Sequence, residues 1–124
     1  MEIVGNFKNG TITISNLKTE DGDYNCHFSF DINVKTFNTS YTYNFGEAVY
    51  FSMYSFIDGK QPKLQDENSI GNYIELTKEY FSITVNQEGF MSNLKIDFDN
   101  FEDQEELSNF LIELNAYCET LIRR

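Results

Sequence analysis

The fold is decided by the stretch at residues 24–34, which has the sequence YNCHFSFDINV. Its apolar and polar residues alternate without interruption. The apolar side carries Tyr24, Cys26, Phe28, Phe30, Ile32 and Val34, and the polar side carries Asn25, His27, Ser29, Asp31 and Asn33. Strict alternation over this length is typical of a β-strand with one face packed in a core and the other exposed to water. The stretch therefore predicts a central strand whose apolar face forms the core.

The segments on either side predict further strands in an antiparallel arrangement. We expect them at residues 3–7, 11–17, 41–45, 73–76, 81–85 and 94–98. The pair Asn9-Gly10 supplies the backbone conformation that a tight hairpin turn requires, and the segment from Asn86 to Gly89 is a second predicted turn. The last three strands are predicted to form a meander over residues 73–99.

Residues 47–57 fit two kinds of secondary structure. Val49, Met53 and Phe56 keep the spacing of a helix, whereas Val49, Phe51 and Met53 also keep the spacing of a strand. A short helix is the preferred interpretation of this segment.

Polar segments between these elements predict breaks and loops. Gly46 interrupts the strand pattern that precedes the short helix. We expect an exposed acidic loop at residues 18–23 and a long loop at residues 60–71, which holds the only proline of the chain.

The end of the chain predicts an amphipathic helix. Its apolar residues recur at steps of three and four, at Leu107, Phe110, Leu111, Leu114, Tyr117, Cys118, Leu121 and Ile122. Asp103 and Glu106 have the spacing of a capping box at the start of a helix. The sequence thus predicts one α+β domain over residues 1–124, with an antiparallel sheet of about six to seven strands and this helix packed on one face.

The net charge of the chain limits the classes of partner that it can bind. Nine Lys and Arg residues stand against twenty Asp and Glu residues, which gives a net charge of -11 at pH 7. This charge repels phosphate backbones and anionic membrane surfaces, so binding of nucleic acid or of a membrane is disfavoured. Two interpretations stay open, namely acidity that serves solubility alone and acidity that attracts a basic protein or substrate.

The cysteines and the start of the chain predict a cytoplasmic location. Met1 to Gly5 shows neither the cationic start nor the apolar run of a signal peptide. Cys26 and Cys118 are too few and too far apart for a disulfide framework, and both fall on predicted apolar faces. We expect both thiols to be buried and reduced. The apolar runs are also shorter than the roughly 18 residues of a membrane span.

No arrangement of residues predicts catalysis, a metal or a cofactor. His27 follows Cys26, but neighbours on a strand point to opposite faces and cannot form a nucleophile and base pair. The acidic run from Asp97 resembles a calcium loop, but Glu102 stands where that loop needs glycine and Ser108 where it needs glutamate. The common zinc, phosphate-binding and serine-hydrolase motifs are missing. We therefore expect a protein without enzymatic activity.

Carboxylates gather around the start of the predicted C-terminal helix. From Asp97 to Glu119 the sequence has eight Asp and Glu residues and neither Lys nor Arg. Capping and the helix dipole favour acids at a helix start, but the excess favours electrostatic attraction of a basic partner. The candidate partner-binding residues are Asp97, Asp99, Glu102, Asp103, Glu105, Glu106 and Glu113.

The order of elements resembles that of a bacterial protein family. The alternating strand at residues 24–34, the segment from Gly46 to Phe56 with an acid ahead of a short helix, the later strands and the closing helix are similar to the WapI-like immunity proteins. This resemblance implies a cytoplasmic bacterial antidote that binds and neutralises the toxin domain of a polymorphic toxin. The alternative is a small soluble structural or assembly domain that self-associates through a sheet edge, for example as a homodimer.

Overall fold

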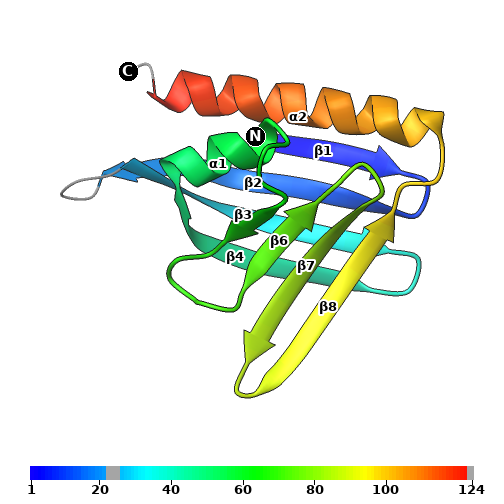
Figure 1. Ribbon diagram of the computed structural model, residues 1–124, viewed down its shortest axis with the longest axis horizontal. Coiled ribbons are helices and arrows are strands. Elements are labelled where there is room, and N and C mark those ends of the chain that lie inside the picture. Colours follow the sequence, from blue (N-terminus) through cyan, green and yellow to red (C-terminus); the bar gives the residue numbers. More distant parts are fainter. Residues whose placement is uncertain (22–25, 123–124) are drawn as a thin grey trace.

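The computed structural model describes residues 1–21 and 26–122 as an α+β fold. Eight strands and two helices occur in the described part of the chain. Their bounds are β1 Glu2–Phe7, β2 Gly10–Asp21, β3 Cys26–Thr36, β4 Ser40–Val49, α1 Tyr50–Ile57, β5 Lys63–Gln65, β6 Tyr73–Leu76, β7 Tyr80–Gln87, β8 Phe90–Asp97 and α2 Phe101–Ile122. Figure 1 shows α2 lying along β1, with the strands of the second half running obliquely to those of the first.

The strands form two sheets, so the prediction of one sheet with six to seven strands is wrong. Sheet A has the order β1-β2-β3-β4 and sheet B has the order β5-β6-β7-β8, each with four strands. All the pairs are antiparallel neighbours in sequence, as predicted. The split lies at α1 and the long segment after it, which carry the chain from one sheet to the other.

Sheet A is built around β3, as the alternating stretch predicts. Phe28, Phe30, Ile32 and Val34 are all at most 2% exposed. Each long apolar side chain removed from water in this way contributes roughly 1.5–3 kcal/mol before the loss of chain entropy. The predicted strand begins at Tyr24, but Tyr24 and Asn25 lie outside the described residues, as does the side chain of Cys26. Residues 22 and 23 of the predicted acidic loop also lie outside them.

Several element bounds differ from the sequence-based expectation. Strand β2 continues through residues 18–21, where we expected a loop, because it pairs with β3 up to Asp21. Strand β4 runs through Gly46 to Val49 instead of breaking there. The preferred helix at residues 47–57 is confirmed in kind, but α1 begins only at Tyr50.

Sheet B contains the predicted meander of β6, β7 and β8. Its tight hairpin turns at Glu88 and Gly89, whose φ angles of 50° and 84° are those of a two-residue primed turn. The additional strand β5 lies inside the predicted long loop, where Lys63 to Gln65 pair with β6. A strand of three residues is too short to show an alternation of apolar and polar residues, so β5 is recognised only by its pairing with β6.

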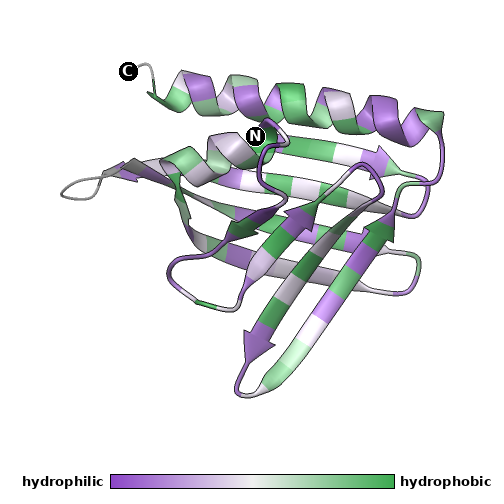
Figure 2. Ribbon diagram, viewed as in Figure 1, coloured by the Kyte–Doolittle hydropathy of each residue, from purple (hydrophilic) through white to green (hydrophobic). Residues whose placement is uncertain are grey.

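Helix α2 places its apolar stripe against the core, as predicted. Its buried apolar residues are Leu107, Phe110, Leu114 and Cys118. Phe110 packs beside Gly5 of β1, where an added Cβ would lie 3.2 Å from the Phe110 ring. Figure 2 shows the apolar residues of α2 and of both sheets as alternating bands. Neither described helix has the length and apolar character that crossing a membrane requires.

The core joins both sheets and both helices in one cluster. Cys118 is fully buried in it, and burial raises the pKa of its thiol to about 12. The prediction of a buried Cys118 is therefore confirmed, and the residue forms no disulfide.

Candidate functional site

The start of α2 carries the carboxylates that the sequence singled out, but the structure divides them by role. Asp103 is only 3% exposed, whereas Glu102 and Glu105 beside it are exposed. Asp103 accepts hydrogen bonds from the backbone N–H of Lys8 at 3.0 Å and from that of Asp99 at 3.0 Å. Asp103 is therefore an internal link between α2 and the β1–β2 turn, and its place in a partner-binding surface is wrong.

The predicted capping box is also wrong. Helix α2 begins at Phe101, and the side chain of Asn100 accepts a hydrogen bond from the backbone N–H of Asp103 at 2.9 Å. Asn100 thus caps the helix three residues before the predicted position. Glu106 instead accepts from the backbone N–H of Asn6 at 2.8 Å, which gives the helix a second link to β1.

Two further acids of the candidate set have partners at the same end of the molecule. Asp97 lies 3.6 Å from the ammonium of Lys95. Asp99 accepts from the side-chain amide of Asn9 at 2.8 Å, and Asn9 also donates to the backbone carbonyl of Asp97. Both carboxylates are exposed, so these contacts leave them accessible to a partner.

Three acids remain that serve no contact within the described chain. Glu102, Glu105 and Glu113 are exposed and make no side-chain hydrogen bond or ion pair to the residues that the structure describes. At 3.6 residues per turn they lie within about 80° of one another around the helix axis. Phe101, which precedes them, is 78% exposed. The helix start therefore presents the free carboxylates of Glu102 and Glu105 close to an exposed aromatic ring, and Glu113 lies about two turns beyond Glu105 on α2.

A second candidate site lies on the polar face of sheet A, which the sequence did not single out. Both strands that flank β3 carry one extra residue, opposite Phe30 on the β2 side and opposite Ser29 on the β4 side. On one side Ser15 and Lys18 of β2 oppose Asp31 and Ser29, and on the other side the register of β4 shifts between Phe28 and Phe30. Asn16, in the first of these bulges, has a φ of 53°. The two bulges open the ladder on both sides of β3, at Phe30 and at Ser29.

The bulges border a hollow of about 640 Å³, which we call the bulge site. Its lining residues are Asn16, Leu17, Lys18, Glu20, Ser29, Phe30, Asp31, Asn44, Gly46 and Asn68. Asp31 accepts from the side-chain amide of Asn16 at 2.7 Å and from that of Asn44 at 2.8 Å. The Ser29 hydroxyl is buried and forms no hydrogen bond to any residue that the structure describes.

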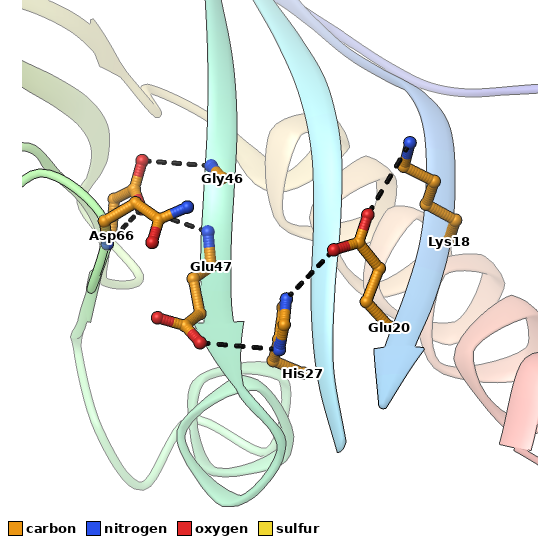
Figure 3. Close-up of polar contacts among 7 residues, drawn as sticks. Lys18, Glu20, His27, Gly46, Glu47 and Asp66 are labelled. Carbon is orange, nitrogen blue, oxygen red and sulfur yellow. Dashed lines mark hydrogen bonds and ion pairs between the residues drawn. The ribbon is translucent and has the colours of Figure 1, made fainter. Parts of the chain in front are cut away.

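Asp66 holds the wall of the bulge site in place. This carboxylate is 1% exposed, and it accepts from the backbone N–H groups of Gly46, Glu47 and Asn68 at 2.9 to 3.0 Å. The hydroxyl of Tyr43 also donates to it at 2.5 Å. Figure 3 shows Asp66 facing the bulged part of β4, at Gly46 and Glu47. A carboxylate with this many donors satisfies the N–H groups that the bulge removes from the ladder.

The hydroxyl of Tyr43, which donates to Asp66, is itself part of a hydrogen-bond network. Burial, and then the hydrogen bond that it donates to Asp66, raise the pKa of its hydroxyl to about 12. The same hydroxyl accepts from the side-chain amide of Asn72 at 3.1 Å, and Asn72 accepts from the backbone N–H of Asn86. The long segment between α1 and β6 is thereby joined to both sheets.

His27, Ser29 and Asp31 lie on one face of β3, and these residue types are those of a serine-hydrolase triad. Their contacts differ from a triad. The two ring nitrogens of His27 lie 3.5 Å from a carboxylate oxygen of Glu20 and 3.4 Å from one of Glu47. Figure 3 shows the imidazole ring between these two carboxylates. Asp31 is bound by amides and the Ser29 hydroxyl by neither residue, so no base is aligned on it.

The comparison with known proteins gives no further assignment. No protein-family model, no curated protein and no solved structure matches the chain. Among the described residues, no group of three or more His, Cys, Asp or Glu side chains has the arrangement of a metal site. The resemblance to WapI-like immunity proteins therefore stays a prediction.

Sequence analysis missed Asp66 and the bulge site for different reasons. Asp66 lies in a polar segment that predicts only a loop, and its partners are more than fifteen residues away on β4. Ser29, Asp31 and Asn44 are ordinary polar positions of alternating strands. The one weak signal in the sequence is the residue type at position 16, because Asn tolerates the positive φ found there better than most residues do.

Proposed function

We propose that the protein is a non-enzymatic acidic binding protein, of the immunity type, that binds and neutralises a basic toxin domain. The observation that carries the proposal is the set of free, exposed carboxylates at Glu102, Glu105 and Glu113 of α2. They lie on one side of a rigid helix of 22 residues, in a chain of net charge -11. A fixed charge of one sign speeds the encounter with a partner of opposite charge and excludes partners of like charge.

The exposed aromatic ring of Phe101 supports a binding surface rather than a purely solvating one. Interfaces commonly combine a buried apolar anchor with a polar rim. Phe101 is 78% exposed between the acids of the β8–α2 connection and those of the helix. Because Asp103 and Glu106 fix the helix start to β1, this ring and the carboxylates are presented without further ordering of the backbone.

The contacts of the polar side chains support a function without chemistry. His27 is held between two carboxylates, and the Ser29 hydroxyl has no aligned base among the described residues. Inhibition by occlusion of an active site needs complementary charge and shape alone.

A second candidate function is self-association through strand β8. This strand is the edge of sheet B, and it exposes Phe90 by 80% and Met91 by 71%. An edge strand with exposed apolar side chains can pair with a second copy. Sedimentation at several concentrations tests this candidate. A tight dimer that the variant Met91→Lys disrupts would favour it over binding of a toxin.

Co-expression with the product of the adjacent upstream gene tests the proposed function. We expect the two proteins to co-purify and the acidic protein to restore growth of cells that express its partner. Absence of both a complex and growth rescue would overturn the assignment. Weakening of a complex between 50 and 500 mM salt is expected, because the attraction is electrostatic.

A further inference from the structure

We propose that the bulge site binds the guanidinium group of an arginine side chain. The site is separate from the helix start, and it lies on the polar face of sheet A around Ser29. Its volume of about 640 Å³ is within the range of pockets that hold small ligands.

The hydrogen bonds inside the site leave several acceptors for a ligand. Asn16 and Asn44 each direct an N–H of the side-chain amide to Asp31, so their carbonyl oxygens remain as acceptors in the lining. Each Asp31 oxygen accepts one of these bonds and retains a further lone pair. A ligand that uses these acceptors must carry several N–H or O–H donors.

The buried Ser29 hydroxyl is a second, independent observation that points to a ligand. Its residue is 92% removed from water, since 8% remains exposed, and the oxygen has no hydrogen-bond partner among the described residues. A buried polar group without a partner costs about 1–3 kcal/mol, so a donor that reaches Ser29 recovers this cost. Ser29 is one of the residues that line the bulge site.

Charge selects a cation over a neutral donor. The lining holds the carboxylates of Asp31 and Glu20 against the single ammonium of Lys18, which pairs with Glu20 at 3.8 Å and is 65% exposed. Guanidinium offers five N–H donors in a planar fork and no acceptor, and it binds a fixed carboxylate better than an ammonium does.

The proposal rests on the proposed function only for the source of the arginine, which would be a basic protein partner. Binding of a free arginine derivative is a property of this chain alone. It can succeed when co-purification fails, and it can fail when co-purification succeeds.

The test is a titration of the ¹⁵N-labelled protein with N-acetyl-arginine amide, followed by NMR at about 150 mM salt. We expect saturable shifts at Ser29, Asp31 and the flanking bulges. Parallel titrations use N-acetyl-lysine amide and glucose, which should cause at least about tenfold weaker effects at these amides.

Two variants assign the binding to the site. Asp31→Asn removes the fixed charge, and Ser29→Ala removes the hydroxyl without changing the charge. Each should weaken arginine binding by about tenfold, whereas the exposed control Glu67→Gln should not weaken it. A folded Ser29→Ala variant keeps the test valid if Asp31→Asn unfolds.

Four results would overturn the proposal. They are the absence of shifts at the bulge site, shifts confined to the carboxylates of α2, equal binding of lysine or glucose, and unchanged binding by Ser29→Ala.

Discussion

The start of α2 and the bulge site differ in how many charged groups they carry and in how many of their polar groups are free to bind a partner. At the start of α2 the charge is dense, yet Asp103 and Glu106 are used as acceptors for backbone N–H groups of the β1–β2 hairpin. At the bulge site the charge is sparse, but a buried hydroxyl has no partner in the described chain. A local excess of acids therefore does not measure how many of them are free to bind. The partners of each carboxylate must be known first.

The largest expected effect is on the free energy of unfolding, where the buried Asp66 is compared with its exposed neighbour Glu67. Asp66→Ala removes the acceptor of three backbone N–H groups and of the Tyr43 hydroxyl, so it should lower the free energy of unfolding by about 4 kcal/mol. Glu67→Ala, one residue later and exposed, should change it by less than about 0.5 kcal/mol. Urea denaturation measures both. Similar losses in the two variants would contradict the supporting role of Asp66.

A second pair of variants tests the division of the acids on α2. Asp103→Ala leaves the N–H groups of Lys8 and Asp99 without an acceptor and should cost about 3 kcal/mol. Its neighbour Glu102→Ala should cost less than about 0.5 kcal/mol. Thermal or urea unfolding provides the comparison. If Asp103→Ala is as stable as Glu102→Ala, the helix start is not anchored as described.

The dependence of stability on alkaline pH tests the hydrogen bond between the Tyr43 hydroxyl and Asp66. The pKa of Tyr43 is raised to about 12 in the folded protein from an ordinary value of 10.0. Above pH 10 the unfolded chain releases this proton while the folded protein keeps it, so the contribution to stability is complete below pH 10 and is lost as the pH rises to 12. The free energy of unfolding should fall over this interval, and less steeply in Tyr43→Phe. Equal slopes in both proteins would show that the Tyr43 hydroxyl is not held as described.

The smallest expected effect is that of Ser29→Ala on stability. The variant removes a buried hydroxyl that has no partner in the described chain, so it should not lower the free energy of unfolding by more than about 0.5 kcal/mol. Urea denaturation of wild type and variant gives this difference. A loss above about 1.5 kcal/mol would mean that the hydroxyl already has a strong partner within the protein.

The features that sequence predicted are those set by local periodicity. The alternation of β3 and the apolar stripe of α2 follow from residue order alone, because period two and period 3.6 each define one buried face. The predicted hairpin between β1 and β2 is present, but the prediction of its turn at Asn9-Gly10 is wrong: Gly10 pairs with Phe7, so the turn residues are Lys8 and Asn9, and neither Asn9 nor Gly10 has a positive φ. The start of α2 was placed too late, since Asn100 and Asp103 both have the chemistry of a cap and only the contacts of Asp103 distinguish them.

The features that sequence did not predict depend on pairing between distant residues. The division into two sheets and the three-residue strand β5 require knowledge of which strands are neighbours. The bulges beside Ser29 are defined by the register of β2 and β4 against β3, and neither strand shows them alone. Asp66 resembles any acid in a polar loop until Gly46 and Glu47 are seen to donate to it.

The measurement that tests the central claim most directly compares two variants of equal charge in binding to the co-expressed partner. One carries Glu102→Gln, Glu105→Gln and Glu113→Gln on α2, and the other carries Glu2→Gln, Glu67→Gln and Glu88→Gln at exposed positions away from the start of this helix. We predict that calorimetry shows at least about tenfold weaker binding for the first variant and almost unchanged binding for the second. Equal affinities of the two variants would contradict the account, because the carboxylates of α2 would then act only through the net charge.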